Sequence, residues 1–91
     1  MRTYEITTLL REGQNLVEET KTAIKEILKK YSVEITLEED WGQKKLWHEK
    51  SGQDYAFFTF LKCKAEPSVV KEIEHEFKLN QNILQALIIK A

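Results

Sequence analysis

Residues 55–64 read YAFFTFLKCK, an aromatic-rich segment whose side chains alternate between two sides with a period of two. This composition and this period are typical of a β-strand. One side would carry Tyr55, Phe57, Thr59 and Leu61, and the other would carry Ala56, Phe58 and Phe60. Because both sides are apolar, the sequence does not decide which phenylalanines face the core.

A helix and a final strand are expected after this segment. Pro67, the only proline, suits the first turn of a helix, where a missing N–H breaks no hydrogen bond. The inward positions recur at helical spacing, with glutamates between them: Val69, Val70, Ile73 and Phe77. Residues 80–82 then predict a turn, and residues 83–90 predict a closing strand.

The residues before the aromatic segment predict a strand, a helix and a hairpin. Residues 2–10 alternate as a strand, and residues 16–31 have the apolar spacing of a helix. Asn15 and Glu18 have the spacing of a capping box at the start of this helix. Residues 33–37 predict a second strand that runs on to Trp41, where Gly42 indicates a bulge or a tight turn. Residues 44–48 are then expected to return as a third strand segment.

This order of elements predicts an α+β fold. It is the ferredoxin-like split βαβ arrangement (βαββαβ), with two helices on one face of a four-stranded antiparallel sheet. We expect residues 1–91 to form a single domain, because a second core would be too small to be stable. The other face of the sheet would stay open, and its apolar residues indicate that a partner packs there.

Composition limits the function classes. Fourteen Lys and Arg against fifteen Asp and Glu give a net charge of −1, so a wholly basic nucleic-acid-binding surface is excluded, although a local basic patch is not. The single cysteine, Cys63, rules out an internal disulfide and a cysteine-based zinc site within this chain. No apolar run is long enough to cross a membrane, and no signal peptide is apparent. We therefore expect a cytoplasmic protein without a membrane partner.

An enzyme is not expected. His75 lies among glutamates on a helix and His48 lies in a predicted hairpin, so neither has an evident catalytic partner. Three glycines provide no phosphate-binding loop, and the glutamates of the second helix are interpreted as a solvated face. We expect no cofactor, no metal site and no small-molecule substrate.

Three segments together resemble the bacterial small-subunit ribosomal protein S6 family. These are Met1-Arg2-Thr3-Tyr4-Glu5-Ile6, Glu39-Asp40-Trp41-Gly42-Gln43-Lys44-Lys45-Leu46, and Phe77-Lys78-Leu79-Asn80-Gln81-Asn82-Ile83-Leu84. They occur in the family's order at both ends and in the middle of the chain. The resemblance implies the ferredoxin-like fold and a structural role in the small ribosomal subunit. It also implies a heterodimer with ribosomal protein S18 that binds the central domain of small-subunit rRNA.

The resemblance also implies a set of site residues. The RNA-binding positions are Arg2, Tyr4, Lys44, Lys45 and Lys90, with Arg2 on phosphate and Tyr4 supporting it by packing or hydrogen bonding. The positions expected to face the partner protein are Trp47, Phe58, Phe60, Leu87 and Ile89. The chain departs from the family at Trp47-His48-Glu49, and at Ser32, where many members have glycine. If Ser32 is left-handed, it costs about 1 kcal/mol.

Two alternatives remain from the residues alone. The aromatic strands would also suit a module that associates with itself through the open sheet or an edge strand. A small acylphosphatase-like enzyme shares the topology, but residues 11–14 make a poor anion-binding loop for it.

Overall fold

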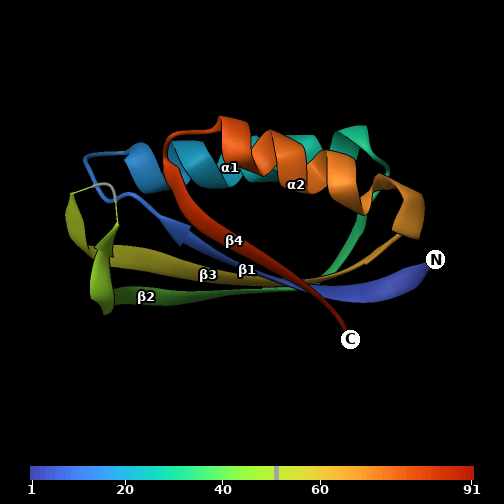
Figure 1. Cartoon of the computed structure of the whole chain (residues 1–91). Coiled ribbons are helices and arrows are strands. Elements are labelled where there is room, and N and C mark those ends of the chain that lie inside the picture. Colours follow the sequence, from blue (N-terminus) through green and yellow to red (C-terminus); the bar gives the residue numbers. More distant parts are fainter. Residues whose placement is uncertain (51) are drawn as a thin grey trace.

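The computed structural model describes residues 1–50 and 52–91, and for residues 47–50 it describes the backbone alone. Figure 1 shows two helices lying on one face of a four-stranded sheet. The elements in order are β1 (Arg2–Leu10), α1 (Leu16–Lys30), β2 (Glu34–Lys50), β3 (Gln53–Ala65), the 3₁₀ turn η1 (Pro67–Val69), α2 (Val70–Leu79) and β4 (Ile83–Lys90). The predicted fold class is confirmed.

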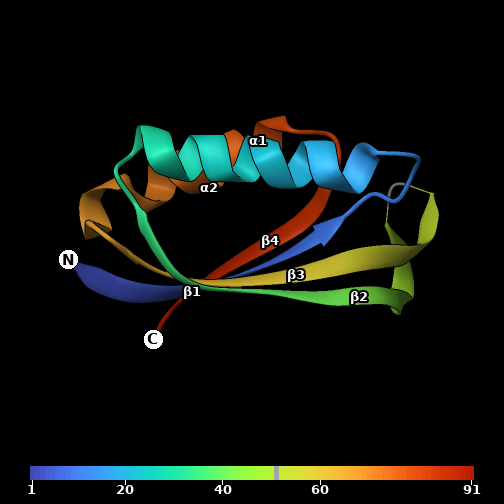
Figure 2. The same ribbon diagram turned by 180° about the vertical axis from the view of Figure 1, so that it is seen from behind.

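The strands lie in the order β2-β3-β1-β4, and each neighbouring pair is antiparallel. The first strand is therefore central and pairs with both β3 and β4. Figure 2, seen from behind, shows α1 on the side of β2 and β3, whereas α2 lies on the side of β4. Since directly opposite residues share a face of the sheet, this register places every strand residue on the helix face or on the open face.

The core lies between the helices and β1. Tyr4, Ile6, Thr8 and Leu10 alternate along β1 and are all buried. Leu28 of α1 and Phe77 of α2 are fully buried and belong to the same core cluster as the apolar residues of β1. Thr8 and Thr59 are also buried, but their hydroxyl groups hydrogen-bond to each other across the β1–β3 pair, so neither is left without a partner.

Helix α1 ends in a Schellman motif. Ser32, at φ 58°, donates its N–H to the Lys29 carbonyl at 3.0 Å, and Val33 donates to the Leu28 carbonyl at 2.9 Å. Ser32 is thus left-handed, which is the condition under which a cost was expected at this position. The capping box expected at the other end is wrong: Asn15 stands at the N-cap with φ 61° and makes no side-chain capping bond. In that conformation its side chain does not reach the first turn of the helix.

The hairpin differs from the expectation. Gly42 has φ +83° and lies at a register shift between Asp40 and Gly42, so it is a bulge rather than a tight turn. Lys44 and Lys45 continue β2 in the same direction and pair with Ala56 and Tyr55 of β3. The expected return strand at 44–48 is therefore wrong. The apolar and charged alternation on each side of Gly42 belongs to one seventeen-residue strand.

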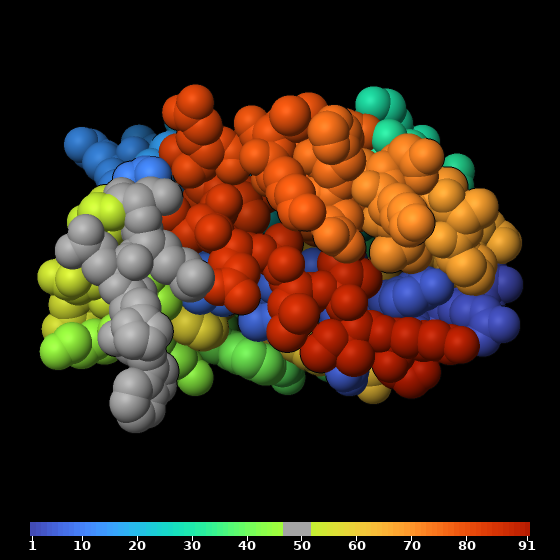
Figure 3. Space-filling model, in the orientation of Figure 1, coloured from blue at the N-terminus to red at the C-terminus, as the bar shows by residue number. Residues whose placement is uncertain are grey.

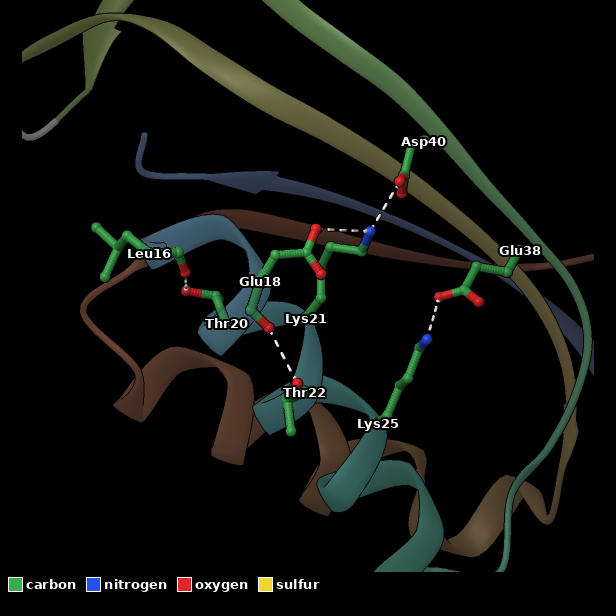
Figure 4. Close-up of polar contacts among 8 residues, drawn as sticks. All are labelled: Leu16, Glu18, Thr20, Lys21, Thr22, Lys25, Glu38 and Asp40. Atoms are coloured by element: carbon green, nitrogen blue, oxygen red, sulfur yellow. Dashed lines mark hydrogen bonds and ion pairs between the residues drawn. The ribbon is translucent and has the colours of Figure 1, made fainter. Parts of the chain in front are cut away.

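Ion pairs hold α1 over β2 (Figure 4). Lys21 Nζ lies 2.7 Å from Asp40 Oδ2, and Lys25 Nζ lies 2.7 Å from Glu38 Oε2. The hydrogen bond to Asp40 raises the pKa of Lys21. Asp40 and Glu38 share the helix face of β2, because they lie opposite Thr59 and Leu61. The ion pairs therefore link α1 to the side of β2 that faces the helices.

Candidate nucleic-acid and partner interface

One end of the sheet carries a basic group formed by both termini. Tyr4 of β1 lies directly opposite Lys90 of β4, and Arg2 lies two residues earlier on the same face of β1. Arg2 and Lys90 are exposed, whereas Tyr4 is 8% exposed and belongs to the core. The residues of the two termini gather at the same end of the molecule in Figure 3. Tyr4 is thus placed to pack beneath the cationic side chains rather than to project from the surface.

This end is not purely cationic. Glu66, after β3, lies 3.8 Å from the N-terminal ammonium group. Lys64 of β3 is exposed beside it and lies opposite Thr3, on the open face. Arg2 presents positive charge on one face of this sheet end, and Lys64, although it lies opposite Glu34 of β2, presents it on the other. Such an arrangement suits contact with a phosphate backbone.

Lys44 and Lys45 lie at the other end of the sheet. Along β3, Ala65 is opposite Arg2 and Tyr55 is opposite Lys45. A strand advances about 3.3 Å per residue, so the two basic groups are about 30 Å apart. The structure therefore brings together Arg2, Tyr4 and Lys90, but it does not bring them together with the Lys44-Lys45 pair.

The open face of the sheet carries an aromatic cluster that we define as Trp41, Phe58, Phe60 and Lys44. The Trp41 and Phe60 rings are stacked, with centroids 5.1 Å apart and an interplanar angle of 7°. Lys44 Nζ lies 5.4 Å from the Trp41 ring centre and 5.7 Å from that of Phe58. Both are cation–π distances, so the ammonium group of Lys44 is held against the cluster.

Apolar residues extend this cluster across the sheet. Phe60 and Leu87 both lie opposite Thr7, one on each side of β1, and Ile89 lies opposite Glu5 in the next row of the same face. Leu87 and Ile89 are each about half exposed. The register thus places four of the five expected partner-facing residues, Phe58, Phe60, Leu87 and Ile89, on one surface. The side chain of the fifth, Trp47, lies outside the described residues, as does that of His48.

Two further residues of this face were not assigned to it from the sequence. Trp41 and Leu37 are each 42% exposed, and neither was among the positions expected to face the partner protein. Leu37 lies opposite Lys62 and Trp41 stacks on Phe60, both on the open face. The alternation of side chains along β2 would have placed Leu37 and Trp41 on the open face only if the bulges of β2 had been known. Each bulge reverses the face of the sheet on which the following side chains lie.

The described residues hold no group of histidines, cysteines and carboxylates that could bind a metal ion. Cys63 is buried among core side chains, and this burial raises the pKa of its thiol, which disfavours the reactive thiolate. Among the described residues, no helix has the length and apolar character needed to span a membrane.

Comparison with known proteins gives one family. The sequence profile described as Ribosomal protein S6 matches residues 3–90. The small ribosomal subunit protein bS6 of Leptospira biflexa is 56% identical over 91 residues, which cover all of this chain and 98% of that protein. The protein of the same name from Elusimicrobium minutum is 36% identical and is matched over 97% of this chain and 86% of its own length.

Solved structures agree on the fold. The crystal structure of 30S ribosomal protein S6 from Thermotoga maritima superposes with a TM-score of 0.90, at 16% identity, over 99% of this chain and 87% of that one. The C-terminal domain of MgtC from Mycobacterium tuberculosis superposes with a TM-score of 0.66 at 10% identity, covering 100% and 88% of the two chains. At such identities these likenesses concern the fold alone.

Proposed function

The chain belongs to the ribosomal protein S6 family, whose members are structural, non-enzymatic components of the small ribosomal subunit, and we propose how it acts there. It binds the central domain of small-subunit rRNA, and it does so as a heterodimer with ribosomal protein S18. Residues 1–91 act in this as one ribosomal-protein domain. The observation that carries the proposal is the separation of an exposed basic end from an apolar open face on the same sheet.

The need for a partner follows from charge. A chain with a net charge of −1 gains little long-range attraction to RNA, and most of its lysines are spread among carboxylates. A basic partner bound to the open face would supply that attraction, while Arg2 and Lys90 would set the orientation. Affinity would then belong to the pair rather than to this chain alone.

Arg2 provides the test of the RNA contact. We expect Arg2→Ala to weaken binding of the protein pair to central-domain rRNA by about 1 kcal/mol, or roughly fivefold, because one phosphate contact is lost. The salt dependence of binding should become shallower as well. A filter-binding titration over a range of salt concentrations measures both.

The matched control is Lys71→Ala, an exposed cation on α2 that belongs to neither basic group of the sheet. It changes the net charge by the same amount but should leave the affinity almost unchanged. If both variants weaken binding equally, the effect is one of overall charge, and Arg2 does not contact the RNA.

Leu87 provides the test of the partner surface. Leu87 is 49% exposed on the open face, and Leu79 is 68% exposed on α2. We expect Leu87→Ser to weaken binding to ribosomal protein S18 about tenfold, because a buried leucine contributes roughly 1.5 kcal/mol or more. Leu79→Ser should have no effect. Calorimetric titration of the two proteins decides this, and equal affinities would remove the open face from the heterodimer interface.

A further inference from the structure

The two outer strands of the sheet are protected very differently against pairing with another strand. β2 has register shifts between Ile35 and Leu37 and between Asp40 and Gly42, and four of its first seven residues are acidic. Bulges and charges are the usual means of blocking an exposed strand edge. The β2 edge therefore resists strand addition.

The β4 edge has no such protection between Gln85 and Ile89. This segment contains no charge and no proline, and it pairs with β1 in unbroken register. It also carries Leu87 and Ile89, both about half exposed. An uncharged, apolar edge strand in regular register is a template for another strand.

The hydrogen-bonding groups available along this edge follow from one bond. The Ala91 N–H donates to the Thr3 carbonyl at 2.9 Å, so Ala91 points its main-chain groups toward β1. Successive residues of an antiparallel strand point these groups to alternate sides. In unbroken register, Leu87 and Ile89 therefore also bond to β1. The main-chain groups of Ala86, Ile88 and Lys90 point away from the sheet.

We propose that β4 pairs in antiparallel fashion with β4 of a second copy of this chain, about a two-fold axis at Ile88. In this register Ala86 lies opposite Lys90 of the second copy, and Ile88 lies opposite Ile88. All three outward-pointing residues then exchange both of their main-chain hydrogen bonds. On the open face, Leu87 of each copy lies opposite Ile89 of the other, so the two exposed apolar residues of the strand cover each other.

Charge also favours a second copy as the occupant. A groove of about 280 Å³ lies between α2 and β4 and is lined by Glu74, Phe77 and Ala86, among others. Lys90 of the second copy, opposite Ala86 and with its side chain on the helix face, would lie beside the Glu74 carboxylate. Glu74 pairs with Lys78 at 3.4 Å; the Lys78 side chain is largely exposed and that of Glu74 about half exposed, so this ion pair is weak and leaves the carboxylate able to receive a second cation.

The dimer is expected to be weak, because one short strand buries less surface than a stable dimer requires. Sedimentation equilibrium of the isolated chain over micromolar to millimolar concentrations should show the mass rising from one chain to two. Amide hydrogen exchange over the same range adds a residue-level measurement. Protection should appear with concentration at Ala86, Ile88 and Lys90, whereas Leu87 and Ile89 should be protected throughout.

Ala86→Pro tests the edge directly, since it removes an outward N–H that β1 does not use. We expect this variant to remain monomeric at every concentration. Trp41→Ala is the control, because it removes the stacked ring of the open face on β2, far from the β4 edge, and should leave the dimer intact. A monomeric wild type, or a dimer lost through Trp41→Ala and kept in Ala86→Pro, would overturn the proposal. If Ala86→Pro does not fold, the exchange measurement on the wild type decides in the same way.

A charge exchange tests the register. Lys90→Glu should weaken the dimer by placing two carboxylates together, and adding Glu74→Lys should restore it. A dimer that is insensitive to Lys90→Glu contradicts pairing centred on Ile88. No RNA is present in these experiments, so their failure would not bear on the proposed role in the ribosome.

Discussion

Ser32 has a left-handed backbone conformation, which is unfavourable for a residue with a β-carbon. It adopts φ 58° to close the Schellman motif after α1, a conformation in which a β-carbon crowds the neighbouring carbonyl. We expect Ser32→Gly to stabilise the protein by about 0.5–1 kcal/mol, since the relief of this strain exceeds the entropy that glycine loses on folding. Urea unfolding measures the change. A destabilised variant would show that the Ser32 side chain makes a contribution larger than the strain.

Asn15 is the natural comparison for Ser32. It has nearly the same φ, 61°, but asparagine tolerates the left-handed region better than serine does. Asn15→Gly should therefore change the free energy of unfolding less than Ser32→Gly. Ser32 was identified as a strained position from the sequence, whereas Asn15 was misread as a side-chain cap. Both amide and hydroxyl side chains cap helices, and only the backbone angle distinguishes a cap from a left-handed turn.

At the scale of elements, the two helices are joined through Glu76 of α2. Its carboxylate accepts a hydrogen bond from the Tyr31 hydroxyl and another from Lys30 Nζ at 3.0 Å, at the end of α1. The bond from Tyr31, followed by that from Lys30, lowers the pKa of Glu76. The contribution of this carboxylate to stability is therefore present above its unfolded pKa and is lost as pH falls through the lower folded value.

This predicts a pH-dependent effect of Glu76→Gln. The variant should unfold at lower urea concentration than the wild type at neutral pH, and the difference should shrink below about pH 4 as the wild-type carboxylate becomes protonated. Glu72→Gln, on the same helix and exposed, is the matched control and should show a smaller difference. A difference for Glu76→Gln that does not change with pH would mean that the carboxylate's charge does not hold the helices together.

The elements themselves were largely predictable, but their pairing was less so. The bounds of β1, α1 and β4 follow from local periodicity and agree with the structure within about a residue. The predicted hairpin does not agree with the structure. The local sequence Trp41-Gly42 is typical of a turn, and only the pairing of β2 with β3 shows that it is a bulge. The sides of Phe58 and Phe60 were equally undetermined, since an apolar pattern on both sides leaves the choice to the register with β1.

At the scale of the whole molecule, the basic end and the Lys44-Lys45 pair lie at opposite ends of a body 36 Å long. The resemblance to the S6 family proposed five RNA-binding positions, but it did not show that they lie in two separate places on the molecule. They are Arg2, Tyr4, Lys44, Lys45 and Lys90. If both places contact RNA, Arg2→Ala and Lys45→Ala should weaken binding independently. Their losses of binding free energy should then add within about 0.5 kcal/mol in the double variant, because the sites share no neighbour.

The double variant also has a clear contrary result. If Lys45→Ala alone leaves the affinity unchanged, Lys45 does not contact the RNA. The same filter-binding titration, with S18 present throughout, gives all four affinities. If the loss of binding free energy in the double variant differs strongly from the sum of the two single losses, the RNA contacts at the two ends of the molecule are coupled.

The central position of β1 has a consequence for synthesis. β1 is the first strand to be made, yet both strands that pair with it, β3 and β4, come from the second half of the chain. While the protein is being translated, β1 has no paired neighbour until β3 has been made, and its second edge is filled only after β4 has been made. Helix α1 can form before β3 and β4 are made, but the sheet around β1 is completed only once β4 is available, by contacts between residues distant in sequence.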